Sequence, residues 1–176
     1  MTILGWAGLA FAAVTGYGVY SFNRLVRLRN QALAAWSDVE VQLKRRHDLL
    51  PKLVEAVRRH AAYERSVLEE VTRLRAETAG ARGGPERKAV PEGRLGEAVQ
   101  RLLALAEAYP ELRADRGFVR LQREISEVEN DLQHARRFYN GAVRLLNTRI
   151  DSFPDLLLAR VFRFRPMAYF QLEGDG

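Results

Sequence analysis

The sequence predicts an all-α protein: an elongated antiparallel bundle of three to four long helices, preceded by an N-terminal transmembrane helix. Three observations support this fold class. Apolar or small residues recur at alternating steps of three and four between Phe118 and Ile150. Residues 2–22 contain no charged side chain. Hydrophobic residues make up 47% of the chain and charged residues 28%, so it can bury a core and keep a solvated surface.

The stretch 118–150 is the strongest helix signal in the chain. Steps of three and four place its apolar residues along one stripe of an α-helix, facing a partner helix. At 1.5 Å per residue this helix is a rod of roughly 50 Å, which other helices must cover because a lone amphipathic helix is marginal in water. The stripe consists of Phe118, Leu121, Ile125, Val128, Leu132, Ala135, Tyr139, Ala142, Leu146 and Ile150.

Residues 1–22 are predicted to be an uncleaved transmembrane anchor that contacts membrane lipids through residues 2–22. The uncharged run has about the length that a helix needs to cross a ~30 Å hydrocarbon layer. Aromatic residues stand near both ends, as in interfacial belts. A cleaved signal peptide is the alternative, because residues 10–13 offer small residues to a peptidase, although no basic segment precedes the run. The aromatic residues are Trp6, Tyr17, Tyr20 and Phe22.

Charge after this run predicts the orientation. Arg24, Arg27 and Arg29 follow it directly and no basic side chain precedes it, so the positive-inside rule places the N-terminus outside and the bundle in the cytoplasm. The segment 24–60 holds nine basic and four acidic residues, a balance of +5 (nine minus four) out of the total of +6. This charge suits either attraction to anionic lipid or nucleic acid, or a solvated helix face.

Residues 23–152 are predicted to form the bundle. A first helix runs to His47, where a cationic cluster suits a helix C-terminus. Asp48 then caps a second helix that tolerates Pro51 in its first turn and extends to about residue 78. Residues 80–93, rich in glycine and proline, form a loop. A third helix covers 95–109, Pro110 ends it, and the helix of 118–150 follows until Phe153 and Pro154 stop it.

A basic and aromatic tail, residues 153–176, completes the chain. If successive helices are antiparallel, the fourth helix returns to the membrane and the tail begins beside it. Two interpretations are equally supported: an interfacial anchor on anionic lipid, or aromatic packing against the end of the bundle. The candidate membrane-surface residues are Arg24, Arg27, Arg160, Phe162, Arg163, Phe164 and Arg165.

The predicted turn between the first two helices is a candidate partner-binding surface. By helix length it lies ~35 Å from the membrane, at the far end of the first helix. Arginine and aromatic residues are the usual anchors of protein interfaces. Helix capping explains the same residues equally well, and nearby Trp36 falls on the apolar stripe and is expected in the core. The turn comprises Lys44, Arg45, Arg46, His47 and Asp48.

The sequence contains no recognisable catalytic or cofactor-binding pattern. Without cysteine, a thiol nucleophile and a disulfide framework are excluded. The serines lie in no strand–turn–helix elbow, and the inward Glu-x-x-His pairs of di-iron bundles do not occur. No metal or cofactor is therefore predicted. Nucleic acid is not predicted as a partner either, because Asp48 adjoins the basic run 44–46 and no nucleic-acid motif surrounds it.

Several motifs closely resemble the LemA family. The resemblance implies a bacterial inner-membrane protein with one N-terminal span, a helical bundle, and no catalytic residues to transfer; the family's biochemical role is not established, and a relative is linked to magnetosome membranes. Arg163 stands where the family usually has glycine, which puts in doubt any tight turn there. Lys52 and the pair Arg59-His60 also depart from the family pattern. The matching motifs are Phe22 to Asn30, Ala35-Trp36-Ser37, Val41 to Pro51, Leu53-Val54-Glu55, Tyr109-Pro110, Phe118, Leu121-Gln122, Ala135-Arg136, Tyr139-Asn140, Asn147, Phe153-Pro154, Phe162, Phe164 and Tyr169-Phe170.

These observations predict a non-catalytic, membrane-anchored scaffold or interaction protein. Other membrane proteins are the expected partners, and a homo-oligomer is a candidate assembly. The alternative is a membrane-surface module that binds lipid or remodels the membrane, using the tail and the arginines next to the anchor.

Overall fold

The computed structural model describes residues 3–61, 64–81 and 83–171, and all regular secondary structure in them is α-helical. The predicted all-α class is thus confirmed for this part of the chain. Six helices follow one another: α1 (Ile3–His60), α2 (Arg65–Gly80), α3 (Pro85–Ala106), α4 (Pro110–Ala114), α5 (Arg116–Asp151) and α6 (Asp155–Val161).

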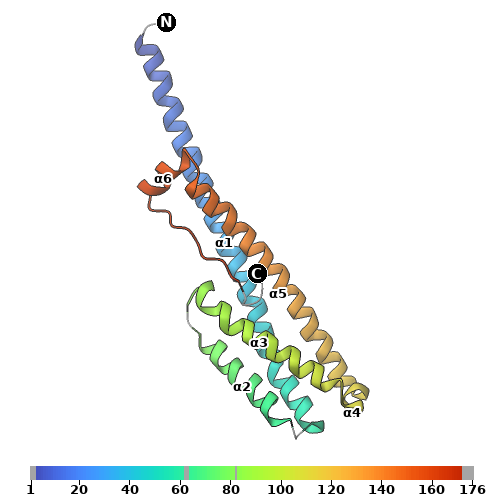
Figure 1. Cartoon of the computed structure of the whole chain (residues 1–176). Coiled ribbons are helices and arrows are strands. Elements are labelled where there is room, and N and C mark those ends of the chain that lie inside the picture. Colours follow the sequence, from blue (N-terminus) through green and yellow to red (C-terminus); the bar gives the residue numbers. More distant parts are fainter. Residues whose placement is uncertain (1–2, 62–63, 82, 172–176) are drawn as a thin grey trace.

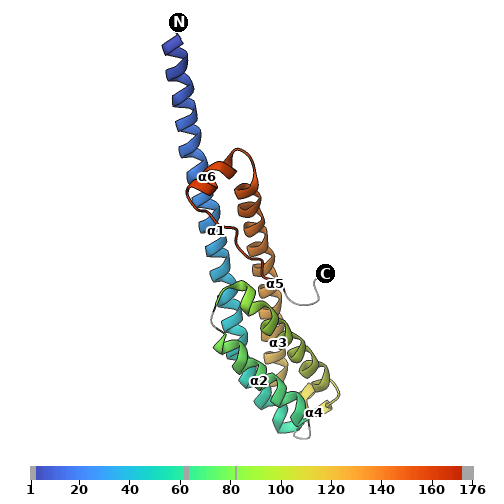
Figure 2. The same ribbon diagram turned by 60° about the vertical axis from the view of Figure 1, so that its left-hand side comes forward.

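The molecule is elongated and its two longest helices run side by side in opposite directions (Figure 1). At one end, called the distal end here, α2 and α3 pack beside α1 and α5 to complete a four-helix bundle (Figure 2). At the proximal end, among the described residues, only α6 and the segment after it accompany the pair, and α1 projects beyond them. The predicted antiparallel order of the long helices is confirmed, and the tail does begin near the projecting end.

Three clusters of buried side chains form the core. The distal core joins α1, α2, α3, α4 and the start of α5. The central core joins the middle of α1 and α5 with Ala89 and Phe170, and the proximal core joins α1 and α5 with Ala159 of α6. Every residue of the predicted α5 stripe is buried except Ala135, which is partly buried and packs on the central core.

The predicted break at Asp48 is wrong, because α1 continues without interruption to His60. Pro51 lies inside this helix and has no N–H to offer the carbonyl of His47, four residues earlier. Arg75 of α2 supplies the missing donor, with its Nε 2.9 Å from the His47 oxygen. The helix therefore tolerates the proline because a side chain from a neighbouring helix satisfies the free carbonyl.

The predicted loop 80–93 is also too long. The described residues between α2 and α3 are only 81, 83 and 84, because Pro85 occupies the first turn of α3, where its missing N–H costs nothing. Pro91 lies within the same helix. Pro110 begins the short helix α4, and Asp115 caps α5 by accepting hydrogen bonds from the N–H groups of Gly117 (2.6 Å) and Phe118 (3.1 Å).

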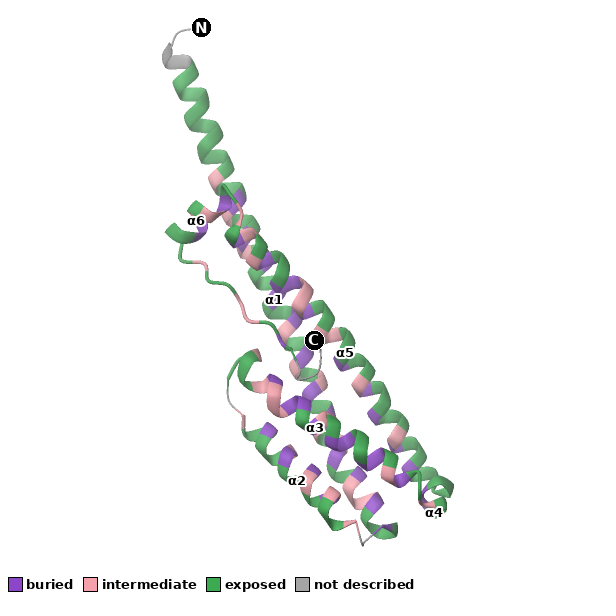
Figure 3. Ribbon diagram, in the orientation of Figure 1, coloured by how far each residue is buried: buried purple, intermediate pink, exposed green. Residues whose placement is uncertain are grey.

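No helix in the described part of the chain combines the length and the apolarity that a membrane span requires, so the predicted transmembrane helix is not supported. Glycines and hydroxyl-bearing residues dilute the apolar side chains of the predicted span. Residues 1–2 of that span lie outside the described residues. The projecting part of α1 is nevertheless exposed over most of its surface (Figure 3). Its exposed large side chains include Trp6, Leu9, Phe11, Val14, Val19 and Tyr20.

Candidate functional site

A buried charge cluster ties the four helices of the distal bundle together. Arg46 of α1 is only 1% exposed and forms an ion pair with Glu92 of α3. Its Nη2 donates to the Glu92 backbone oxygen at 3.0 Å, and its Nη1 donates to Glu129 of α5 at 3.1 Å. His47 Nε2 lies 3.1 Å from Glu92 Oε1 and 3.1 Å from the hydroxyl of Thr78 on α2. Along α1 and α5 this polar layer lies between the distal and central cores.

The ionisation of Glu92 is set by opposing effects. Burial raises the pKa of this carboxyl, whereas the hydrogen bond to His47 and the positive charges of Arg46 and His47 lower it. The charged partners prevail, and the pKa of Glu92 lies below its ordinary value of 4.5. The cluster is therefore held together by an ionised carboxylate.

We expect the charge on Glu92 to make the bundle acid-sensitive. A carboxyl with a lowered native pKa contributes its stabilisation fully above the unfolded value and loses it as the pH falls through the native value. The urea midpoint of the wild type should therefore decrease below pH 4.5 more steeply than that of Glu92→Gln. The difference between the two proteins should be largest at neutral pH and should shrink in acid. Parallel curves would show that Glu92 does not supply this dependence.

The structure separates the five residues of the predicted partner-binding turn. They lie inside α1, in its last third, so no turn exists there, and Arg46 faces inward. Arg45 faces outward and pairs with Asp131 at 3.1 Å, both side chains being half exposed. Lys44, His47 and Asp48 line a cleft of about 270 Å³ between α1, α2 and α3. The other charged residues of its lining are Glu40, Arg75, Lys88 and Glu92, and its remaining lining residues are Leu43, Thr78, Ala79 and Ala81.

Sequence reasoning missed the acidic partners in this cluster. Glu92 lies between Pro91 and Gly93, in the predicted loop 80–93, and Glu129 follows the stripe residue Val128. Neither has a local signal of burial. A metal site is not formed in the described residues, which contain no group of three or more suitable side chains.

The tail forms a tight turn after α6. Arg163 has φ of +57°, the left-handed conformation that glycine adopts most easily. The N–H of Phe164 donates to the oxygen of Ala159 at 2.9 Å, and the N–H of Arg163 donates to Arg160 at 3.2 Å. The turn that the arginine put in doubt is therefore present.

Beyond this turn the chain runs back along α1 and α5. Asn147 of α5 accepts from the N–H of Met167 and donates to its oxygen, both at 2.9 Å. Asn140 contacts the N–H and oxygen of Phe170 in the same way, at 2.9 and 3.0 Å. Seven residues of helix rise ~10.5 Å and three extended residues span about 10 Å, so the two spacings match. The asparagines thus clamp the tail by its backbone.

The end of this segment belongs to the central core. Phe170 is fully buried, and its ring centroid lies 5.4 Å from that of Trp36. The Tyr139 hydroxyl donates to the oxygen of Ala168 at 2.6 Å. Burial, and to a smaller extent the charge of Glu86, raises the pKa of Tyr139 to about 12, so the phenol keeps the proton that it donates. Of the two predicted roles for the tail, packing on the bundle is confirmed for Phe170.

The beginning of the segment leaves a groove of about 590 Å³ against α1. The ring of Phe22 contacts those of Phe162 and Phe164, with centroids 4.8 and 5.8 Å apart. Four predicted membrane-surface residues line this groove, whereas Arg24, Arg27 and Arg160 are exposed outside its lining. The lining consists of Phe22, Val26, Arg29, Asn30, Leu33, Phe162, Arg163, Phe164, Arg165, Pro166 and Met167.

A second buried carboxylate holds α6 in place. Asp155 is 1% exposed, accepts a hydrogen bond from the hydroxyl of Tyr17 at 3.0 Å, and also contacts the hydroxyl of Ser21. Arg149 of α5 pairs with the same carboxylate. These contacts join α6 to both long helices at the point where α1 begins to project.

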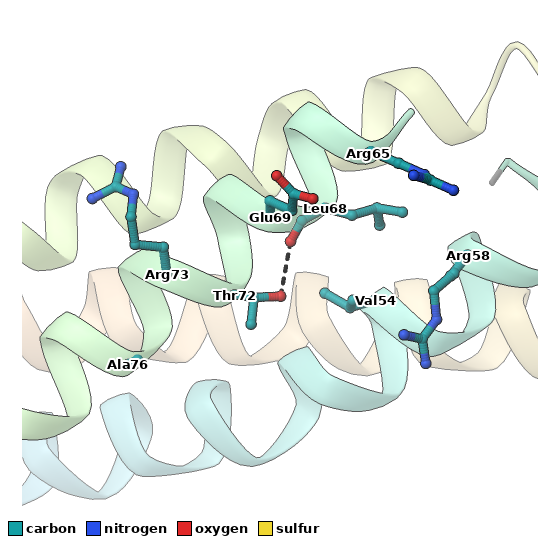
Figure 4. A pocket seen from close by; sticks show the side chains of 8 residues that line it. All are labelled: Val54, Arg58, Arg65, Leu68, Glu69, Thr72, Arg73 and Ala76. Atoms are coloured by element: carbon teal, nitrogen blue, oxygen red, sulfur yellow. Dashed lines mark hydrogen bonds between the residues drawn. The ribbon is translucent and has the colours of Figure 1, made fainter. Parts of the chain in front are cut away.

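Another hollow, of about 640 Å³, lies between α1 and α2 at the distal end (Figure 4). Val54 of α1 and Leu68 of α2 face each other across it, with Arg58 and Arg65 at one end. Glu69 and Arg73 complete its charged lining. Arg58 already pairs with Glu55 and Arg73 with Glu77, so much of this positive charge is locally compensated.

Comparison with known proteins agrees with the resemblance in the sequence. The sequence model of the LemA family matches residues 35–176. Magnetosome protein MamQ 2 of Paramagnetospirillum magneticum is 27% identical over 180 residues, covering 88% of this chain and 66% of that protein. Magnetosome protein MamQ of Magnetospirillum gryphiswaldense is 25% identical with the same coverage. Protein LemA of Metamycoplasma hominis is 24% identical over 149 residues, covering 85% of this chain and 68% of that protein.

The chain therefore spans slightly less than two thirds of the length of the MamQ relatives. The matched residues extend from the middle of α1 through the end of the tail, and so include the buried charge cluster and the asparagine clamps. A family model that matches this much of the chain establishes family membership. This protein belongs to the LemA family.

Proposed function

We propose that this protein is a non-catalytic scaffold that attaches to a membrane through the projecting end of α1 and presents its distal bundle to other membrane proteins. The observation that carries the proposal is the uncharged, exposed apolar end of α1, which extends beyond the three core clusters. The buried charged residues Arg46, Glu92 and Asp155 are all ion-paired within the protein, which supports a structural role for them.

Exposed apolar surface of this extent favours a lipid environment. Residues 1–23 contain no charged side chain, and Phe11 and Val14 are 74% and 73% exposed. Transferring such side chains from water to lipid is favourable by about 25 cal/mol per Å² of apolar surface. Arg24 and Arg27 follow at once and favour the cytoplasmic side of a bacterial inner membrane for the bundle. The magnetosome names of the MamQ relatives are compatible with membrane attachment.

Liposome flotation tests the attachment. The full chain should float with phospholipid vesicles, and Phe11→Asp/Val14→Asp should remain in the dense fraction because each carboxylate opposes insertion. The matched control is Val41→Asp/Phe138→Asp, which replaces two exposed apolar residues on the bundle and should still float. Circular dichroism should show equal helix content in all three proteins. Equal flotation of both double variants would contradict attachment through α1.

Photocrosslinking in native membranes tests the scaffold role. One probe replaces Lys44 in the α1–α2–α3 cleft and a second replaces Arg65 at the distal hollow, with exposed Arg123 of α5 as the control position. A discrete adduct with another membrane protein at Lys44 or Arg65, and not at Arg123, is the expected result. If the protein formed adducts only with itself, the result would contradict a scaffold for other proteins and would indicate a homo-oligomer.

A membrane-remodelling module is the second candidate, favoured by the basic and aromatic groove beside the projecting helix. Vesicle shape distinguishes the two functions. A scaffold should leave vesicles undeformed at high occupancy, whereas a remodelling protein should tubulate or fragment them. Electron microscopy of vesicles with and without the protein provides this comparison.

A further inference from the structure

The groove between α1 and residues 162–167 has a composition that suits one class of ligand. Its aromatic and aliphatic side chains form an apolar lining, and its ionisable side chains are Arg29, Arg163 and Arg165. No carboxylate among the described residues lines it. We propose that this groove binds one anionic phospholipid, with the phosphate held by the arginines and part of an acyl chain lying on the aromatic rings. The inference rests on the proposed membrane attachment and names the lipid class that is recognised there.

The position of the groove suits a lipid at the membrane surface. Phe22, Val26, Arg29 and Leu33 follow one another at steps of four, three and four, so they form one face of α1 directly after its uncharged end. A lipid beside the emerging helix would have its headgroup level with this face. The volume of about 590 Å³ lies within the usual range of ligand pockets.

Different side chains of the lining would contact the phosphate and the acyl chain of the lipid. Guanidinium groups bind phosphate oxygens through paired hydrogen bonds and stay charged at any physiological pH. Arg29, Arg163 and Arg165 are exposed and carry this charge at the surface. Leu33 and Phe162 remain 44% and 53% exposed, so an acyl chain would cover apolar surface that the protein leaves open.

The backbone of Arg163 supplies an independent observation. Its positive φ is disfavoured for a residue with a Cβ atom, and glycine would adopt it without strain. Strained residues of this kind gather at ligand sites, where the side chain has a role that outweighs the cost. At this position the strained residue adds a positive charge to the groove. Its replacement by glycine should therefore have opposite effects on folding and on lipid binding.

Native mass spectrometry of the full chain in detergent, with added phosphatidylglycerol, measures this binding. The wild type should retain one lipid per chain in preference to phosphatidylcholine. Each arginine near an anionic phosphate contributes about a fivefold gain in affinity, so Arg163→Gly should weaken retention ~5-fold and Arg29→Gln/Arg165→Gln roughly 25-fold. Arg163→Gly should also raise the melting temperature. Arg160→Gln removes one exposed charge outside the groove and should leave retention unchanged.

Three results would overturn the proposal. Equal losses in Arg160→Gln and Arg163→Gly would indicate unspecific attraction to net charge. If Arg163→Gly were more stable and retained lipid as well as the wild type, Arg163 would have no role in lipid binding. Displacement of the lipid by inorganic phosphate at similar concentration would indicate a phosphate site. Flotation of the wild type reports membrane attachment separately, so failure of the lipid site and failure of the proposed function are distinguishable.

Discussion

Arg46→Ala should destabilise the protein by about 3–5 kcal/mol, because removal of one partner leaves the buried carboxylate of Glu92 without its strongest counter-charge. The Arg46 side chain contacts both the carboxylate and the backbone oxygen of Glu92, and it also donates a hydrogen bond to Glu129. Loss of the guanidinium would therefore weaken the connection of α1 to both α3 and α5. Urea unfolding followed by circular dichroism at neutral pH measures the change.

The neighbouring residue provides the matched control. Arg45 forms an ion pair of 3.1 Å with Asp131, but both side chains are half exposed. Exposed pairs typically contribute less than about 1 kcal/mol, so Arg45→Ala should change the unfolding free energy little. Similar losses for the two variants would show that helix propensity or net charge, and not burial, determines the effect. A stability of Arg46→Ala equal to that of the wild type would contradict the structural role of the cluster.

Phe170→Ala should have the second largest effect, a loss of up to about 3–5 kcal/mol, because it empties a fully buried aromatic site. Since the residue lies near the end of the described chain, part of this loss should appear as local release of the segment 164–171. Tryptic cleavage of the bond between Arg163 and Phe164 should become faster. In a Trp6→Phe background, the fluorescence of Trp36 should shift to longer wavelength, because Phe170 contacts its ring.

Phe162→Ala is the control for the second prediction. Phe162 is 53% exposed, so its truncation should cost much less than that of Phe170 and should leave tryptic cleavage after Arg163 almost unchanged. Continued protection of the segment in Phe170→Ala would mean that the backbone contacts of Asn140 and Asn147 hold it without the buried ring.

Periodicity predicted the long helix α5 well because the physical signal is local. Nearly the whole stripe from Phe118 to Ile150 is buried, and the antiparallel order of the helices places the tail near the projecting end of α1. Proline was the main source of error. The sequence pattern predicts Pro51 in a first helical turn and Pro91 in a loop, yet both lie inside helices. For Pro51 the reason is a contact from a distant residue, Arg75, which satisfies the His47 carbonyl.

The candidate sites show the same division between features that depend on local sequence and features that depend on contacts between distant residues. The sequence alone determined the helical class, the α5 stripe, the uncharged N-terminal run and the aromatic character of the tail, because each depends on residue type and spacing along the chain. Only the tertiary structure decided that Arg46 is buried while Arg45 is exposed, that Glu92 and Glu129 meet it, and that two asparagines clamp the tail. These contacts join residues that are far apart in the chain, and their energy depends on burial that exists only after the helices have packed.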